Sequence, residues 1–156
     1  MTYFEDRLAD YDRIHRNPIN RVLHAVGIPT IQLGVLGLLG LVKGPSPMVN
    51  GATALIAVGF IIMARYSIRA AIAQTIFASL VAYTAFVISD SQPMLVSFAI
   101  FGAAFVVGWM LQFAGHAFER QSPEFVRTPL NLLIGPLFVL NEVFRILPNI
   151  ASSQRS

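Results

Sequence analysis

Long apolar stretches, separated by short polar breaks, run through most of the chain. Four of them follow one another, each close to the ~17–25 residues that cross a bilayer as a helix, at 22–42, 48–64, 70–89 and 94–115. The breaks contain residues that cannot continue a helix, such as Pro45 and Pro47 in the first and Pro93 in the third. The pattern predicts an all-α fold, an integral membrane bundle of four transmembrane helices.

The segment before the first apolar stretch has a different pattern. Residues 1–17 hold four acidic residues and three arginines among apolar positions that are mostly three or four apart. This spacing is typical of an amphipathic helix lying on a membrane surface. Glu5 and Asp6 stand where a signal peptide is basic, so we expect this segment to stay in the mature protein.

The last part of the chain mixes apolar and charged residues. Glu142 and Arg145 lie inside the apolar segment 129–147, and an unpaired charge at the middle of a bilayer costs ~2.5–3.5 kcal/mol. We therefore predict a re-entrant or interfacial hairpin over 129–147, with a fifth span as the alternative. Residues 150–156 have the composition of a disordered tail.

Composition supports a membrane-embedded protein. Apolar residues make up 55% and charged residues 12% of the 156, against roughly 45–50% and about 25% in soluble domains. So few charges cannot cover a surface exposed to water, and the length fits a single domain over 1–156. The chain has no cysteine, which excludes disulfides, thiolate nucleophiles and thiolate metal sites. Glycines within the apolar stretches fit close packing of helices in lipid, at positions 27, 34, 37, 40, 59, 102 and 108.

The basic residues indicate an orientation. With four spans, the N-terminal segment, the turn at 65–69 and the residues after His116 share one side of the membrane, and ten of the eleven basic residues fall there. Lys43 lies on the opposite side. The positive-inside rule then predicts cytoplasmic termini. In a bacterium this would be the inner or plasma membrane. The basic residues are scattered singly rather than grouped in a stripe, which argues against a nucleic-acid partner.

All three histidines fall on that same side, although the sequence separates them widely. His15 precedes the first span, His24 lies in its first turns and His116 ends the fourth. A single histidine at a membrane interface is commonly a satisfied polar residue, and that interpretation stays open for each. Three histidines in one layer of a chain with few polar residues also indicate a metal site.

The residues between the first two histidines allow them to meet. His15 and His24 are nine positions apart, which in one unbroken helix places them on opposite faces, at about 900° of rotation. Asn17 followed by Pro18 supplies a break, since Asn caps helices and Pro suits the first helical position. Asn20 shares a face with His24 and is either an interfacial amide or a residue that holds a water or orients a ligand.

A second polar group ends the fourth apolar stretch. Gln112, His116 and Glu119 are spaced four and three apart, so they share one face if the helix continues. Imidazole and carboxylate ligands without thiolates suit Fe(II), with Zn(II) or Mn(II) as alternatives, and open coordination positions would admit oxygen or substrate. Glu119 is otherwise a solvated charge. Glu142 either supports an imidazole or pairs with Arg145, three residues further on.

Two motifs in the chain match a known family. The first holds His15, Pro18, Asn20, His24 and Pro29, and the second is Gly108-Trp-x-x-Gln112-Phe-x-Gly115-His116, followed by Phe118-Glu119, Pro123, Pro136 and Glu142. In this order they resemble the fungal 2-hydroxy fatty acid dioxygenase family, which has bacterial members. The resemblance covers nearly the whole chain.

The resemblance implies an integral membrane enzyme that depends on Fe(II). Such an enzyme takes a 2-hydroxy fatty acid from the membrane lipid and shortens it by one carbon, consuming O₂ and releasing CO₂. It implies His15, His24 and His116 as metal ligands and catalytic residues, Glu119 as a further catalytic residue, and Asn20, Gln112 and Glu142 as supporting residues. The alternatives are a small transporter subunit or lipid-binding scaffold without enzymatic activity, and haem binding by His24 and His116.

Overall fold

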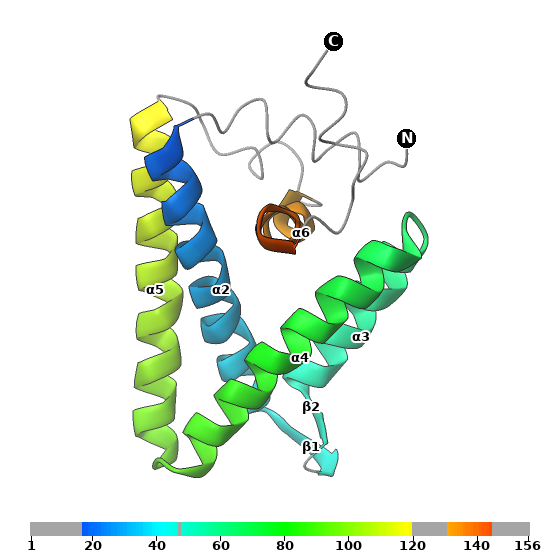
Figure 1. Cartoon of the computed structure of the whole chain (residues 1–156). Helices are drawn as coiled ribbons and strands as arrows, with labels where there is room; N and C mark the ends of the chain where they lie inside the picture. The colour runs from blue at the N-terminus through cyan, green and yellow to red at the C-terminus, as the bar shows by residue number, and fades with distance from the viewer. Residues whose placement is uncertain (1–16, 47, 120–130, 145–156) are drawn as a thin grey trace.

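A computed structural model describes residues 17–46, 48–119 and 131–144. Within these ranges the fold is all-α with one small hairpin (Figure 1). Its elements are α2 (Pro18–Gly40), β1 (Lys43–Ser46), β2 (Val49–Asn50), α3 (Gly51–Ala64), α4 (Ile68–Asp90), α5 (Met94–Glu119) and α6 (Asn131–Phe144). The predicted amphipathic segment before Asn17 and the predicted tail at 150–156 lie outside the described residues.

Local capping explains where three of the helices begin. The Asn17 side chain accepts a hydrogen bond of 2.9 Å from the backbone N–H of Ile19, and Pro18 is the first residue of α2. This confirms the predicted break at Asn17 and Pro18, because an Asn cap satisfies a backbone donor that the first helical turn leaves free. Asn50 and Thr53 form a capping box at α3, and Ser67 caps α4.

Three of the helices are long and apolar enough to cross a membrane. These are α2, α4 and α5 up to Phe118. The predicted second span, 48–64, is shorter in the structure, because Val49 and Asn50 pair with β1 as an antiparallel hairpin and the helix begins only at Gly51. The 14 residues of α3 reach about 21 Å, against ~30 Å of hydrocarbon in a bilayer. By length, the structure therefore supports three of the four predicted spans.

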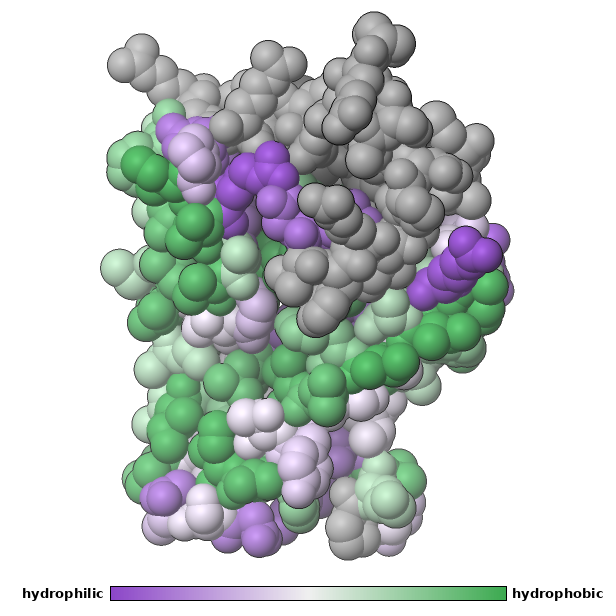
Figure 2. All heavy atoms as spheres, viewed as in Figure 1, coloured by the Kyte–Doolittle hydropathy of each residue, from purple (hydrophilic) through white to green (hydrophobic). Residues whose placement is uncertain are grey.

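Four of the helices form two pairs. Helix α2 packs along α5, α3 packs along α4, and α2 also contacts α4, so that the pairs diverge toward one end of the molecule (Figure 1). The start of α2, the end of α5 and the α3–α4 turn all lie at this end, while the hairpin and the α4–α5 turn lie at the other. This is the placement that alternating spans predict. Apolar side chains cover most of the visible face between the two ends (Figure 2).

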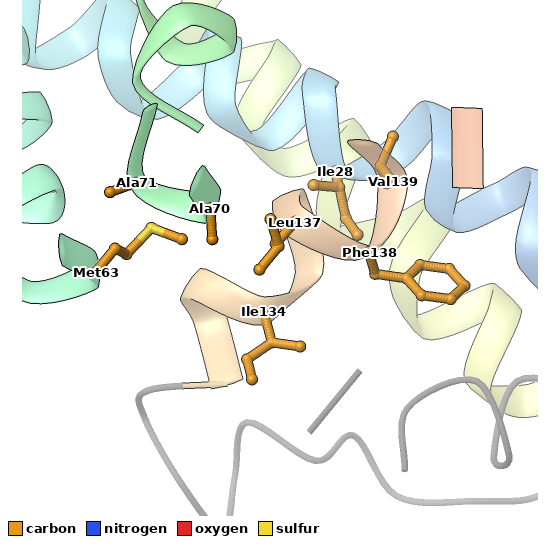
Figure 3. Close-up of a cluster of buried hydrophobic side chains, with 8 residues drawn as sticks. All are labelled: Ile28, Met63, Ala70, Ala71, Ile134, Leu137, Phe138 and Val139. Atoms are coloured by element: carbon orange, nitrogen blue, oxygen red, sulfur yellow. The ribbon is translucent and has the colours of Figure 1, made fainter. Parts of the chain in front are cut away.

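Helix α6 lies between the two pairs. Figure 1 shows α6 nearly end-on, while α2 and α5 run from the top to the bottom of the view, so α6 is crosswise to them. It is one continuous helix with Pro136 inside it, so the hairpin predicted for this segment is wrong over 131–144. Every residue from 134 to 140 is buried. The cluster that holds α6 joins it to α2, α3 and α4 (Figure 3) and comprises Ile28, Met63, Ala70, Ala71, Ile134, Leu137, Phe138 and Val139.

Candidate functional site

The backbones of α2 and α5 lie in direct contact along a line of glycines. A Cβ added at Gly34 would lie 2.6 Å from the backbone nitrogen of Phe105, and one at Gly108 would lie 2.7 Å from that of Ile31. Both distances are far below van der Waals contact, so no other residue fits there without moving a helix. Small residues give this close approach in helices that pack in lipid. The glycine line therefore fixes the register in which α2 and α5 present their polar residues.

His24 of α2 and His116 of α5 meet at one end of this interface. Their ring centroids are 4.9 Å apart and the ring planes are at 84°. His24 is 0% exposed and His116 is 7% exposed. Two imidazoles in such close contact inside an apolar bundle form a polar site shielded from solvent.

The orientation of His24 is set by its own helix. Its Nδ1 lies 3.0 Å from the backbone carbonyl oxygen of Asn20, one turn earlier. Because a carbonyl oxygen only accepts hydrogen bonds, Nδ1 is the protonated nitrogen and the Nε2 atom of the neutral ring carries the lone pair. Histidines that bind metals are commonly held in this way by a carbonyl at the other ring nitrogen.

Two amide side chains complete the polar site. Asn20 is 0% exposed and Gln112 is 6% exposed. Both amide atoms of Asn20 and the Nε2 atom of Gln112 have no hydrogen-bond partner within the described part of the chain. A buried polar atom without a partner costs roughly 1–3 kcal/mol, so such atoms beside two imidazoles point to a bound group or water that would satisfy them.

Glycines provide the space for these amides. A Cβ at Gly115 would collide with Oδ1 of Asn20 and lie 3.1 Å from Nδ1 of His24. A Cβ at Gly27 would lie 2.6 Å from Nε2 of Gln112. We call Asn20, His24, Gln112 and His116 the polar seam.

Helix α6 contributes a charge beside the seam. Glu142 forms an ion pair with Arg21 of α2, and the Arg21 guanidinium carbon lies 5.9 Å from the centre of the Phe138 ring. The side chains of Arg21 and Glu142 are 33% and 39% exposed. From the sequence, Glu142 was predicted either to support an imidazole or to pair with Arg145. The structure instead pairs it with Arg21, and Arg145 lies outside the described residues.

The structure thus brings together four of the residues that the sequence singled out, namely the polar seam. His15 lies outside the described residues, and Glu119 is the last residue of α5, with a side chain that is not described. In the described ranges, no group of three or more His, Asp or Glu residues gathers in a way that could hold a metal. Sequence reasoning missed Arg21, whose position three residues before His24 at the start of an apolar helix was the available signal.

Comparisons with known proteins agree with the motifs. A family model described as 2-hydroxy-palmitic acid dioxygenase Mpo1-like matches residues 1–146, nearly the whole chain. No curated protein and no solved structure matches.

Proposed function

Because the chain belongs to the 2-hydroxy-palmitic acid dioxygenase Mpo1-like family, we propose that it is a membrane-bound, Fe(II)-dependent dioxygenase acting on 2-hydroxy fatty acids. The reaction converts R-CH(OH)-COOH and O₂ into R-COOH, CO₂ and H₂O. Atoms and electrons balance without an external reductant, since O₂ takes up the electrons released as the chain loses one carbon. No reductant or nucleotide cofactor has to bind beside the substrate.

The observation that carries the proposal is the buried contact between His24 and His116. Neutral imidazoles are good ligands for Fe(II), and the Nε2 atom of His24 carries the lone pair of the ring because Nδ1 is bonded to the Asn20 carbonyl. His24 and His116 would hold the iron, which when bound supplies the activation of O₂. His15 is proposed as the third ligand. Glu119, at the end of α5, is proposed as a further catalytic residue.

Asn20 and Gln112, the other two residues of the polar seam, would contact the substrate or water that binds beside the imidazoles. The side-chain amides of Asn20 and Gln112 offer donors and an acceptor that no described residue uses. They would orient the 2-hydroxyl group of the substrate or a water molecule. Burial of the seam keeps bulk water away from the reacting carbon.

The surroundings favour delivery of the substrate from a membrane. Helices α2, α4 and α5 are long and apolar enough to span a bilayer. Figure 2 shows an apolar face between two more hydrophilic ends, and the seam lies at the end of the molecule where α2 begins. We propose that the acyl tail lies among the helices, that the carboxylate lies near the seam, and that the termini are cytoplasmic.

One preparation tests the proposal. The full-length protein is purified from membranes in detergent, and its iron content, optical spectrum and activity on 2-hydroxyhexadecanoic acid are measured. We expect about one iron per chain, no Soret band, and O₂-dependent formation of pentadecanoic acid and CO₂. A Soret band would replace the proposal with haem binding, and a metal-free, inactive protein would favour a scaffold without enzymatic activity.

A further inference from the structure

The ion pair between Arg21 and Glu142 places a carboxylate next to the polar seam. Arg21 is three residues before His24 on α2, a rise of about 4.5 Å along the helix axis, and it directly follows the fully buried Asn20. Its guanidinium group receives the carboxylate of Glu142 beside the ring of Phe138. The Arg21 guanidinium, which already binds one carboxylate, therefore lies next to the site at which we propose that a 2-hydroxy acid reacts.

The other described cations lie elsewhere. Of the four basic residues in the part of the chain that the structure describes, Lys43 is in the hairpin at the opposite end, and Arg65 and Arg69 flank the α3–α4 turn. Arg21 is the one on α2, the helix that carries His24. Because the carboxylate of a 2-hydroxy acid is bonded directly to the reacting carbon, its binding group must lie close to the imidazole pair. Arg21 meets this condition among the described cations.

We propose that Arg21 binds the carboxylate of the substrate, and that Glu142 occupies this position in the substrate-free protein. This inference rests on the proposed function. The planar guanidinium group matches a carboxylate with two parallel hydrogen bonds, and the Phe138 ring lies beside it, 5.9 Å from the guanidinium carbon. The substrate then replaces Glu142 by an exchange of one carboxylate for another. Arg21 stays paired, and the released Glu142 side chain, already 39% exposed in the ion pair, can be hydrated.

The exchange makes the attachment of α6 depend on the substrate. An apolar cluster also holds α6 against its neighbours, with Ile134, Leu137 and Val139 among its members. Release of Glu142 would therefore loosen the end of α6 near Arg21 while this apolar cluster keeps the helix between the two pairs. Arg21 is a specificity residue in this scheme, selecting acids over uncharged 2-hydroxy lipids.

The test compares two variants that both break the ion pair. Binding of 2-hydroxyhexadecanoic acid and of the uncharged 1,2-hexadecanediol is measured by titration calorimetry on the purified, iron-containing protein without O₂, so that no turnover occurs. We expect Arg21→Gln to weaken binding of the acid about ten- to hundredfold, as for a lost hydrogen bond to a charged group. We expect Glu142→Gln to strengthen it about two- to fivefold, the range that a partly exposed ion pair contributes. Binding of the diol should change in neither variant.

The opposite signs separate this inference from a purely structural ion pair. If the pair merely fixes α6, both variants change binding of the acid in the same direction, and the inference is wrong. Arg65→Gln, the same loss of charge at the exposed α3–α4 turn, is the control and should bind like the wild type. Should Arg21→Gln fail to fold, Arg21→Lys decides, with weaker acid binding expected because a point charge lacks the guanidinium fork.

The proposed function can fail separately. A wild-type protein that binds and shortens the acid, together with unchanged acid binding in Arg21→Gln, overturns only the role of Arg21. A wild-type protein that binds neither the acid nor the diol overturns the proposed function and this inference with it.

Discussion

The imidazole ring of His24 meets that of His116 edge to face, with 4.9 Å between the ring centroids. The contact exists because glycines let α2 and α5 approach until their backbones touch, as at Gly34 and Gly108. A larger residue at either position would separate the helices and the two imidazoles with them. The close packing of α2 against α5 therefore also brings the two imidazoles of the site together.

Replacing either imidazole should remove the iron. We expect His24→Ala and His116→Ala each to abolish iron retention and O₂-dependent shortening of 2-hydroxyhexadecanoic acid, because each loses a proposed ligand. Metal analysis of the purified variants and product detection check this. His15→Ala should behave in the same way if His15 is the third ligand.

Thermal unfolding of these variants in detergent serves as the control for folding. The variants should remain folded, since the glycine line and the apolar cluster around α6 are unchanged. Full iron content and normal turnover in His24→Ala would show that the proposed centre is wrong.

Replacing Asn20 should lower the affinity for iron without lowering the stability of the fold. The side-chain amide of Asn20 has no hydrogen-bond partner among the described residues. Asn20→Ala therefore breaks no side-chain hydrogen bond with a described residue, and the unfolding temperature should stay the same or rise. Affinity for iron should fall by about 10–100-fold, the usual effect of losing a residue that supports metal ligands. Competition with a chelator measures that affinity.

Gln74→Ala is the matched control for Asn20→Ala. Gln74 lies on α4, is 8% exposed and also has a buried amide oxygen without a described partner. It lies outside the polar seam, so its replacement should leave iron affinity unchanged. Equal losses of iron affinity in the two variants would contradict a specific role for Asn20.

Features set by neighbouring residues were predictable from the sequence. Asn17 and Pro18 start α2 as expected, because capping involves only the first turn of the helix. The ends of the long helices follow from Pro and polar residues in the breaks, such as Pro93 before α5. The all-α class and the end of the bundle at which His24 and His116 meet followed from the same breaks.

Features that depend on distant partners were not predictable. The hairpin of 129–147 was inferred from the cost of unpaired charges, but Glu142 is paired with Arg21, 121 positions earlier, so a single helix can carry it. The start of α3 was missed for a different reason, because Val49 pairs with Ser46 of β1, only three positions earlier, and a short apolar run does not distinguish strand from helix. Glycine packing was also selective: Gly34 contacts α5 closely, whereas a Cβ at Gly59 or Gly102 would meet nothing within 4 Å.

Single cysteines can establish the orientation, because the chain has none of its own. We expect Gln92→Cys, in the α4–α5 turn, to react with a membrane-impermeant maleimide in intact cells, and Tyr66→Cys, in the α3–α4 turn, to react only after lysis. Both positions are exposed and lie at opposite ends of the molecule. Labelling of Tyr66→Cys alone in intact cells would reverse the predicted orientation.

Met48→Cys tests whether α3 completes a span. Met48 is 85% exposed and lies in the hairpin, at the other end of α3 from Tyr66. Labelling of Met48→Cys but not of Tyr66→Cys in intact cells would mean that α3 crosses the membrane despite its 14 residues. If both positions are protected, the chain does not cross at α3.

Adding one methyl group at Gly115 should damage the site, and the same change at Gly102 should not. Both glycines lie on α5, but a Cβ at Gly115 collides with Asn20 and presses on His24, while a Cβ at Gly102 meets nothing within 4 Å. Overpacking of this kind costs about 1–3 kcal/mol, so we expect Gly115→Ala to lower the unfolding temperature and iron retention together. Gly102→Ala should leave iron retention unchanged and the unfolding temperature equal or higher, since Ala favours helix by roughly 0.8–1 kcal/mol over Gly. Equal behaviour of the two variants would mean that the contact of Gly115 with Asn20 and His24 does not shape the site.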